Sequence, residues 1–99
     1  MKIPKHLQSV LWSTDVSLLD TKRDKNYIIH QILSYGRLED IRWLLQTYTK
    51  KDIISVFANI PYKDYDAARF FFVKNHLLNL KHQLLDEMLY VKNIPRHLG

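Results

Sequence analysis

The sequence contains no cysteine, and only two glycines and three prolines occur among its 99 residues. The lack of cysteine excludes disulfide bonds, thiolate zinc sites and cysteine nucleophiles. With Gly36 and Gly99 as the two glycines, the chain cannot form a glycine-rich phosphate loop, which excludes P-loop and dinucleotide-binding motifs. No run of 18 apolar residues is present, so we expect no membrane span. No apolar signal segment follows the N-terminal residues, so we expect a cytoplasmic protein.

The composition that remains is that of an ordinary globular protein, with 25% charged and 46% hydrophobic residues. Its length predicts a single domain over residues 1–99. The net charge is +5, but the basic residues are spread along the chain without any run of five like charges. We interpret them as solvated surface charge, with an acidic partner and nucleic acid as the alternatives.

The hydrophobic residues follow helical spacing almost throughout, and strand and hairpin signals are nearly absent. The spacing predicts helices over residues 4–12, 22–35, 38–48, 50–60, 66–80 and 81–91, with a short turn at 16–19. The 81–91 helix could also continue the 66–80 helix directly, because no glycine or proline separates them. We therefore expect an all-α fold, a compact single-domain bundle of five or six short helices, with a frayed tail at 95–99.

Local signals refine these elements. We expect Thr14 or Asp15 to cap the short turn at 16–19, Thr49 the 50–60 helix, and Asp64 or Asp66 the 66–80 helix. Thr21 and Asp24 have the spacing of a capping box. Gly36 follows the 22–35 helix, where a residue with positive φ would end it and begin a helical hairpin. In the second helix of that hairpin one predicted buried face consists of Leu38, Ile41, Leu44, Leu45 and Tyr48.

Catalytic chemistry finds little support in the sequence. The acidic residues Asp15, Asp24, Glu39 and Asp40 lie at expected helix starts, where a carboxylate caps free N–H groups and stabilises the helix dipole. The five histidines form no H-E-x-x-H motif, and we expect them on the surface, His30 included, on the polar side of its helix. The sequence therefore predicts a protein that is not an enzyme and that uses neither a metal nor a cofactor.

The helices over 38–48 and 50–60 are joined by a tight turn, which is the coarse arrangement of a helix-turn-helix motif. The second of them would offer Lys50, Lys51 and Ser55 to nucleic acid. The turn lacks the usual glycine and the helix has few polar positions for reading bases, so packing of two core helices is the competing interpretation.

Aromatic residues outside the predicted apolar faces are the most informative feature. Trp43 and Tyr27 fall away from the buried sides of their helices, and Trp12 lies near the end of the first helix. Trp and Tyr dominate binding hot spots, so these residues are candidates for a partner interface, although packing beneath another segment would also explain them. Phe72 belongs to a run of three phenylalanines that cannot all face one core, so it would be sandwiched between helices or would meet a partner or a second copy.

Several short strings, taken together, resemble a known family: Leu11-Trp12-Ser13-x-Asp15, Asp24-Lys25-x-Tyr27-Ile28-Ile29, Ile32-Leu33-x-Tyr35-Gly36 and Glu39-Asp40-Ile41-x-Trp43-Leu44. They look like a family of small uncharacterised helical proteins encoded beside nucleotidyltransferase toxins of the AbiEii/AbiGii type. The resemblance covers roughly residues 11–78. It implies an antitoxin-like protein or an accessory subunit of such a toxin. Our main hypothesis is a non-enzymatic protein-interaction module for that partner, and the alternatives are a DNA-binding regulator and a homo-oligomeric structural module.

Overall fold

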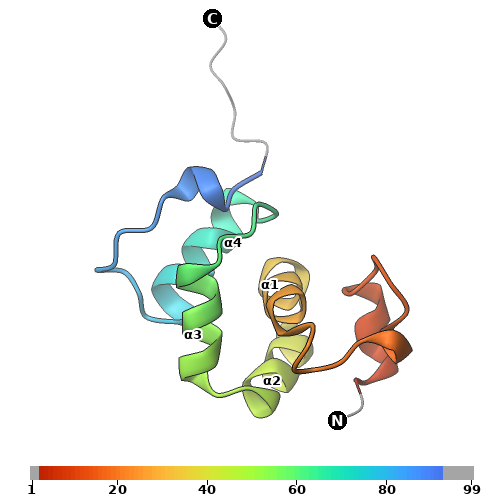
Figure 1. Ribbon diagram of the computed structural model, residues 1–99. Helices are drawn as coiled ribbons and strands as arrows, with labels where there is room; N and C mark the ends of the chain where they lie inside the picture. The colour runs from red at the N-terminus through yellow and green to blue at the C-terminus, as the bar shows by residue number, and fades with distance from the viewer. Residues whose placement is uncertain (1–2, 93–99) are drawn as a thin grey trace, which may run out of the picture.

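The computed structural model describes residues 3–92, and its regular structure is helical. The α-helices are α1 (Lys25–Tyr35), α2 (Leu38–Thr47), α3 (Lys50–Asn59) and α4 (Ala67–Phe71), as Figure 1 shows. Two 3-10 helices, η1 (Lys5–Ser9) and η2 (Val16–Leu18), precede α1. A π-helical segment, η3 (Phe72–Leu77), continues α4, and a last 3-10 turn, η4 (Glu87–Leu89), follows it. The predicted all-α class is confirmed. The predicted number of five or six helices is too high, because residues 3–92 contain four α-helices, and α4 is only five residues long.

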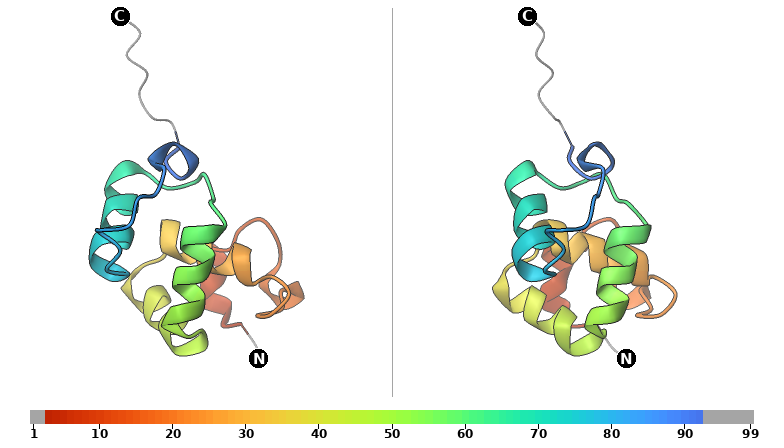
Figure 2. Two further views of the ribbon diagram at one scale, coloured as in Figure 1. Left: turned by 60° about the vertical axis from the view of Figure 1, so that its left-hand side comes forward. Right: turned by 90° about the vertical axis from the view of Figure 1, so that its left-hand side faces the viewer.

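The centre of the molecule is α1. It packs against α2 and α3, and Figures 1 and 2 show the N-terminal segment on its other side. Its aliphatic side chains Ile28, Ile29, Ile32 and Leu33 are completely buried. The polar residues between and after them are buried as well, so residues 28–34 form a continuous buried stretch. A helix covered on all sides is the core element of its fold.

The predicted caps of the later helices are confirmed. The Thr49 hydroxyl accepts a hydrogen bond from the Asp52 N–H (3.1 Å), and the Asp66 carboxylate accepts one from the Arg69 N–H (2.8 Å). Such caps satisfy N–H groups that have no partner inside the helix.

Gly36 ends α1 differently from the prediction, with φ −68° rather than a positive φ. The position needs glycine for lack of space, since a Cβ would lie 2.5 Å from the Ile32 carbonyl oxygen.

The N-terminal part is less helical than its spacing suggested. The helix predicted over 4–12 is only the 3-10 helix η1, which buries Leu7. Asp15 caps η2 by accepting from the Ser17 N–H (2.9 Å), in agreement with the prediction. The Thr21–Asp24 capping box does not form, because the Asp20 carboxylate accepts from the N–H groups of the preceding turn and α1 begins at Lys25.

The predicted buried face of α2 is only partly buried. Ile41 and Leu44 point into the core, whereas Leu38 is 77% exposed and Leu45 is 43% exposed. The reason is that α2 packs mainly against α1, and Leu38 and Leu45 lie outside that contact. Hydrophobic spacing alone could not show how many neighbours this helix has.

The C-terminal part has an aromatic core. The rings of Phe57, Tyr65, Phe70 and Tyr90 all lie within contact of one another, with ring centres 4.9–6.3 Å apart. An isolated parallel bridge joins Tyr65 to Val91, through the Tyr65 N–H to the Tyr90 carbonyl (3.0 Å) and the Lys92 N–H to the Tyr65 carbonyl (2.9 Å). This bridge anchors the end of the described chain to the loop before α4.

The helix predicted over 81–91 is wrong, because this stretch contains only the 3-10 turn η4. Asn79 adopts positive φ (55°) just after η3, which redirects the chain. Tyr90 and Val91 are then held by the bridge to Tyr65 in a backbone path that no helix over 81–91 could follow. The predicted frayed tail at 95–99 lies outside the described residues. Within residues 3–92 no helix has the length and apolar character needed to cross a bilayer.

Candidate protein-interaction surface

One side of α1 carries Tyr27, Gln31 and Tyr35, which share a face because they are four residues apart. Gln31 is buried and joins two other segments to this face. Its side-chain amide donates to the Val10 carbonyl (2.9 Å), and its side-chain oxygen accepts from the Tyr62 hydroxyl (3.0 Å). The N-terminal segment and the loop before α4 are thereby fixed on either side of one helical face.

Trp12 lies on this face, where its ring packs edge-on against Tyr35 with 4.7 Å between ring centres. It is nevertheless 54% exposed, which is unusual for the largest side chain. Next to it, Ser13 donates both its N–H (3.3 Å) and its hydroxyl (2.7 Å) to the Tyr27 hydroxyl oxygen. The structure therefore brings together two of the predicted partner-binding residues, Trp12 and Tyr27.

Two tyrosines that the sequence did not single out complete the surface. Tyr62 stacks on His30, with 5.1 Å between ring centres and 17° between planes. The Lys92 ammonium lies 4.7 Å from the centre of the Tyr35 ring, a cation–π contact. It also donates a hydrogen bond to the Tyr35 hydroxyl oxygen. We call Trp12, Tyr27, Tyr35 and Tyr62 the aromatic face.

The hydroxyls of Tyr35 and Tyr62 on this face stay protonated at neutral pH. Burial raises the pKa of Tyr35 and that of Tyr62. The hydrogen bond to Tyr35 in turn raises the pKa of Lys92, whose ammonium also lies 3.7 Å from the Asp64 carboxylate. The surface thus combines apolar rings with neutral hydroxyl groups at their tips and one cation beside them, a combination typical of protein interfaces.

His30 supports the aromatic face from below, and its predicted surface position is wrong because it is 1% exposed. Its Nε2 lies 2.6 Å from the Ile60 carbonyl oxygen and its Nδ1 lies 2.8 Å from the Tyr65 hydroxyl. A carbonyl can only accept, so Nε2 carries the proton and Nδ1 accepts from Tyr65. Burial lowers the pKa of His30 to about 4, so the ring is neutral and stacks beneath Tyr62.

The other two predicted partner-binding residues lie elsewhere. Trp43 is half-buried on α2 and packs against the hydrophobic core. Phe72 is 44% exposed at the start of η3, which Figures 1 and 2 place across α1 from the N-terminal segment. Of the three consecutive phenylalanines only Phe70 is buried, while Phe71 and Phe72 face solvent.

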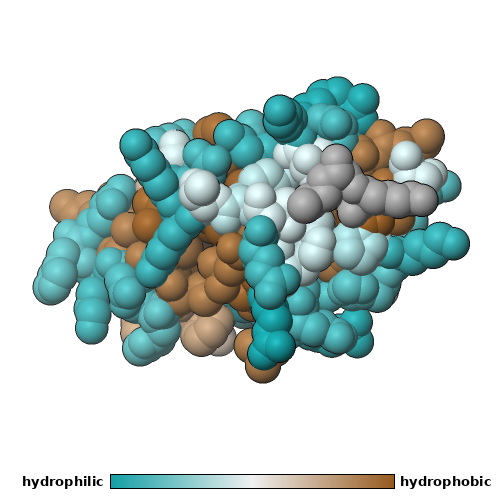
Figure 3. All heavy atoms as spheres, turned by 90° about the horizontal axis from the view of Figure 1, so that it is seen from below, coloured by the Kyte–Doolittle hydropathy of each residue, from teal (hydrophilic) through white to brown (hydrophobic). Residues whose placement is uncertain are grey.

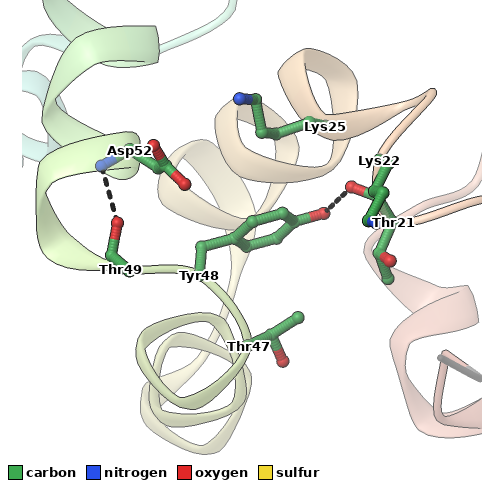
Figure 4. Close-up of a pocket in the computed structure, with 7 residues that line it drawn as sticks. All are labelled: Thr21, Lys22, Lys25, Thr47, Tyr48, Thr49 and Asp52. Atoms are coloured by element: carbon green, nitrogen blue, oxygen red, sulfur yellow. Dashed lines mark hydrogen bonds between the residues drawn. The ribbon is translucent and has the colours of Figure 1, made fainter.

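The nucleic-acid candidates Lys50, Lys51 and Ser55 are exposed on α3, whose first turn follows the short connection from α2. A pocket of about 430 Å³ lies beside that turn (Figure 4), and the residues lining it are Thr21, Lys22, Lys25, Thr47, Tyr48, Thr49 and Asp52. The Tyr48 hydroxyl closes one side by donating to the Thr21 carbonyl (2.6 Å).

The charge around this pocket is mixed. Lys22 and Lys25 line it together with the Asp52 carboxylate. Burial, together with the negative charges of Asp20 and Asp24, raises the pKa of Tyr48 to about 12, so two more carboxylates act on the same place. A surface that binds a phosphate backbone is usually more uniformly positive, so the geometry favours the aromatic face as the candidate site.

The fold and this surface define a small all-helical protein with an exposed aromatic face. Within residues 3–92, no group of three or more His, Asp or Glu side chains is arranged to hold a metal ion. Residues 6–57 match the model of a family of unknown function (DUF6922), and the chain belongs to that family. No curated protein and no solved structure matches it. The matched range contains Trp12, Tyr27 and Tyr35, whereas Tyr62 and Lys92 lie beyond it.

Proposed function

We propose that this protein is a non-enzymatic binding module that docks a partner protein on its aromatic face. The resemblance of its sequence strings suggests that the partner is a nucleotidyltransferase toxin and that the module is antitoxin-like. In keeping with the sequence, we place this interaction in the cytoplasm. The module would act by covering or altering the surface of the toxin.

The observation that carries this proposal is the position of Trp12. Its ring is 54% exposed although Tyr35 supports one edge of it at 4.7 Å. Burying the remaining surface against a partner would remove a large apolar area from water. Trp and Tyr are also the residues in which interface binding energy is most often concentrated.

The support beneath the aromatic face favours tight binding. Tyr27 is held by Ser13, and Tyr62 is held between its hydrogen bond to Gln31 and its stacking on His30. Side chains already fixed in place lose less conformational entropy when a partner binds. The face is therefore prepared for docking without reorganisation.

The experiment is co-purification of the tagged full chain with the toxin at low and high salt, followed by calorimetric titration. We expect a complex that resists salt, because apolar burial dominates the interface. Trp12→Ala should weaken binding by at least about 1 kcal/mol, or roughly fivefold, without unfolding the protein.

Phe72→Ala is the matched control, because Phe72 is an aromatic residue of similar exposure outside the aromatic face. It should leave the affinity unchanged. Wild-type affinity in a folded Trp12→Ala variant would contradict the proposal. A loss confined to Phe72→Ala would instead place the interface on η3.

A further inference from the structure

A second surface, formed by the 84–89 segment, combines exposed apolar side chains with acidic groups. In the 84–89 segment Leu84 is 98% exposed, Met88 is 53% exposed and Leu89 is 49% exposed. The charged residues of this segment are Asp86 and Glu87, so its formal charge is −2. Apolar side chains gathered at this exposure commonly mark an interaction site.

The backbone of this segment is held in place. The Asp86 carboxylate accepts from the Met88 N–H (3.0 Å) and so caps η4. Directly afterwards Tyr90 and Val91 are buried, and the bridge to Tyr65 fixes them. The exposed side chains are therefore presented to solvent by an anchored turn.

The outer side of α2 offers a complementary surface. Leu38 and Leu45 are exposed there, two helical turns apart on α2. Arg37 and Arg42 border the same side, and together with Leu38 and Glu39 they line a hollow of about 340 Å³. We call Arg37, Leu38, Arg42 and Leu45 the α2 stripe. Figure 3 views the molecule from below, the end at which α2 lies, and shows areas of apolar surface among polar side chains there.

One arginine of the α2 stripe, Arg42, can pair with an acidic partner. Arg37 lies near two carboxylates of its own helix, 3.4 Å from Glu39 and 3.6 Å from Asp40. No ion pair within residues 3–92 involves Arg42. An acidic, apolar segment would match both the exposed leucines and this arginine.

The two surfaces cannot meet within one molecule. Figures 1 and 2 show α2 at one end and the turn at Glu87–Leu89 at the opposite end. We propose that copies of this chain associate head to tail, with the 84–89 segment of one copy on the α2 stripe of the next. Each contact buries leucines on both sides and places Asp86 and Glu87 beside Arg42. Because two different surfaces meet, the assembly grows as a ring or an open chain and not as a two-fold dimer.

Two variants of the full chain test this arrangement by analytical ultracentrifugation over a concentration series. The first, Leu84→Ser with Met88→Ser, removes the apolar part of the 84–89 segment. The second, Leu38→Ser with Arg42→Glu, disables the α2 stripe. The wild-type protein should exceed the mass of a dimer as concentration rises, whereas each variant alone should remain monomeric. Their equimolar mixture should form a 1:1 complex and grow no further, because it retains a single working contact.

Leu18→Ser is the control, since Leu18 is 68% exposed on η2 outside both surfaces, and it should associate as the wild type does. All the substituted positions are exposed, so circular dichroism should confirm native helix content in every variant. A wild-type protein that stays monomeric at every concentration would overturn the proposal. So would a dimer that both variants still form, or a mixture of the variants that gives no complex.

Discussion

The part of the chain matched by the family model, residues 6–57, and the part that follows it bury their side chains in different ways. The first part surrounds α1 with aliphatic residues, and Ile28, Ile29, Ile32 and Leu33 have no exposed surface. The second part contributes Tyr65, Phe70 and Tyr90 to a cluster of aromatic rings. It also contains the most exposed leucine, Leu84 at 98%, among the described residues.

This difference shows how the second part depends on the first. Most of the regular helix lies in residues 6–57, whereas the later part combines α4 and η3 with a long irregular path. Its aromatic rings gather around Phe57, the last residue of the family match. Arg69 on α4 also donates to the Leu33 carbonyl (2.7 Å) and to the Gly36 carbonyl, placing a cation at the C-terminal end of α1. The later part is therefore attached at a few identifiable residues.

Replacing Phe57 should break this attachment most severely. Phe57→Ala removes a fully buried ring that contacts Tyr65, Phe70 and Tyr90, and we expect a loss of about 4 kcal/mol in the free energy of unfolding. Urea denaturation followed by circular dichroism measures it. Phe72→Ala, at an exposed ring, should cost under about 1 kcal/mol. Similar losses for the two variants would show that the ring cluster does not join the two parts.

The same comparison shows how far the sequence predicts the structure. Helical spacing located α1, α2 and α3, and capping preferences identified Thr49 and one of two candidates, Asp64 or Asp66, of which Asp66 is the cap. These features depend on neighbouring residues. The spacing failed over 81–91, where Tyr90 and Val91 are held by the distant Tyr65. Long-range pairing overrode a local preference there.

The candidate site was predictable only in part, because some of its residues reach it through contacts with segments that are distant in the sequence. Tyr27 stood out because it falls away from the apolar face of its helix, and Trp12 because it is a tryptophan near the end of the first predicted helix. Tyr35 and Tyr62 did not, since their place on the aromatic face depends on how the N-terminal segment and the loop before α4 fold over α1. His30 was assigned to the polar side of α1, and that side is the one these segments cover. The spacing of apolar residues marks one face of a helix, and it does not show how many other segments pack against that helix.

His30 gives a second way to test the junction, through pH. Its pKa is about 4 in the folded protein because of burial, against about 6.5 in the unfolded chain. Between these values the unfolded chain binds more protons, so stability is complete above pH 6.5 and is lost as the pH falls toward 4. The difference corresponds to about 3 kcal/mol.

Urea denaturation at a series of pH values between 4 and 7 measures this loss. His30→Gln keeps a donor toward the Ile60 carbonyl and should flatten the dependence across this range. His76→Gln, at an exposed histidine, should keep the wild-type slope. An unchanged slope in His30→Gln would mean that the imidazole takes up its proton in the folded protein as readily as in the unfolded chain.

The smallest expected effect tests a single hydrogen bond between the two parts. The Phe57 carbonyl near the end of α3 would normally accept from the N–H four residues later, but that residue is Pro61, which has none. The buried Tyr90 hydroxyl donates to this carbonyl instead (2.6 Å). Tyr90→Phe keeps the ring in the aromatic cluster and leaves the carbonyl without this donor, so it should lower the free energy of unfolding by about 1 kcal/mol.

Tyr62→Phe is the comparison. The Tyr62 hydroxyl donates to Gln31 in a half-exposed place where water can replace it, so this variant should lower the free energy of unfolding by less. If Tyr90→Phe costs no more than Tyr62→Phe, the Phe57 carbonyl has found water, and the ring cluster alone holds the later part of the chain to α3.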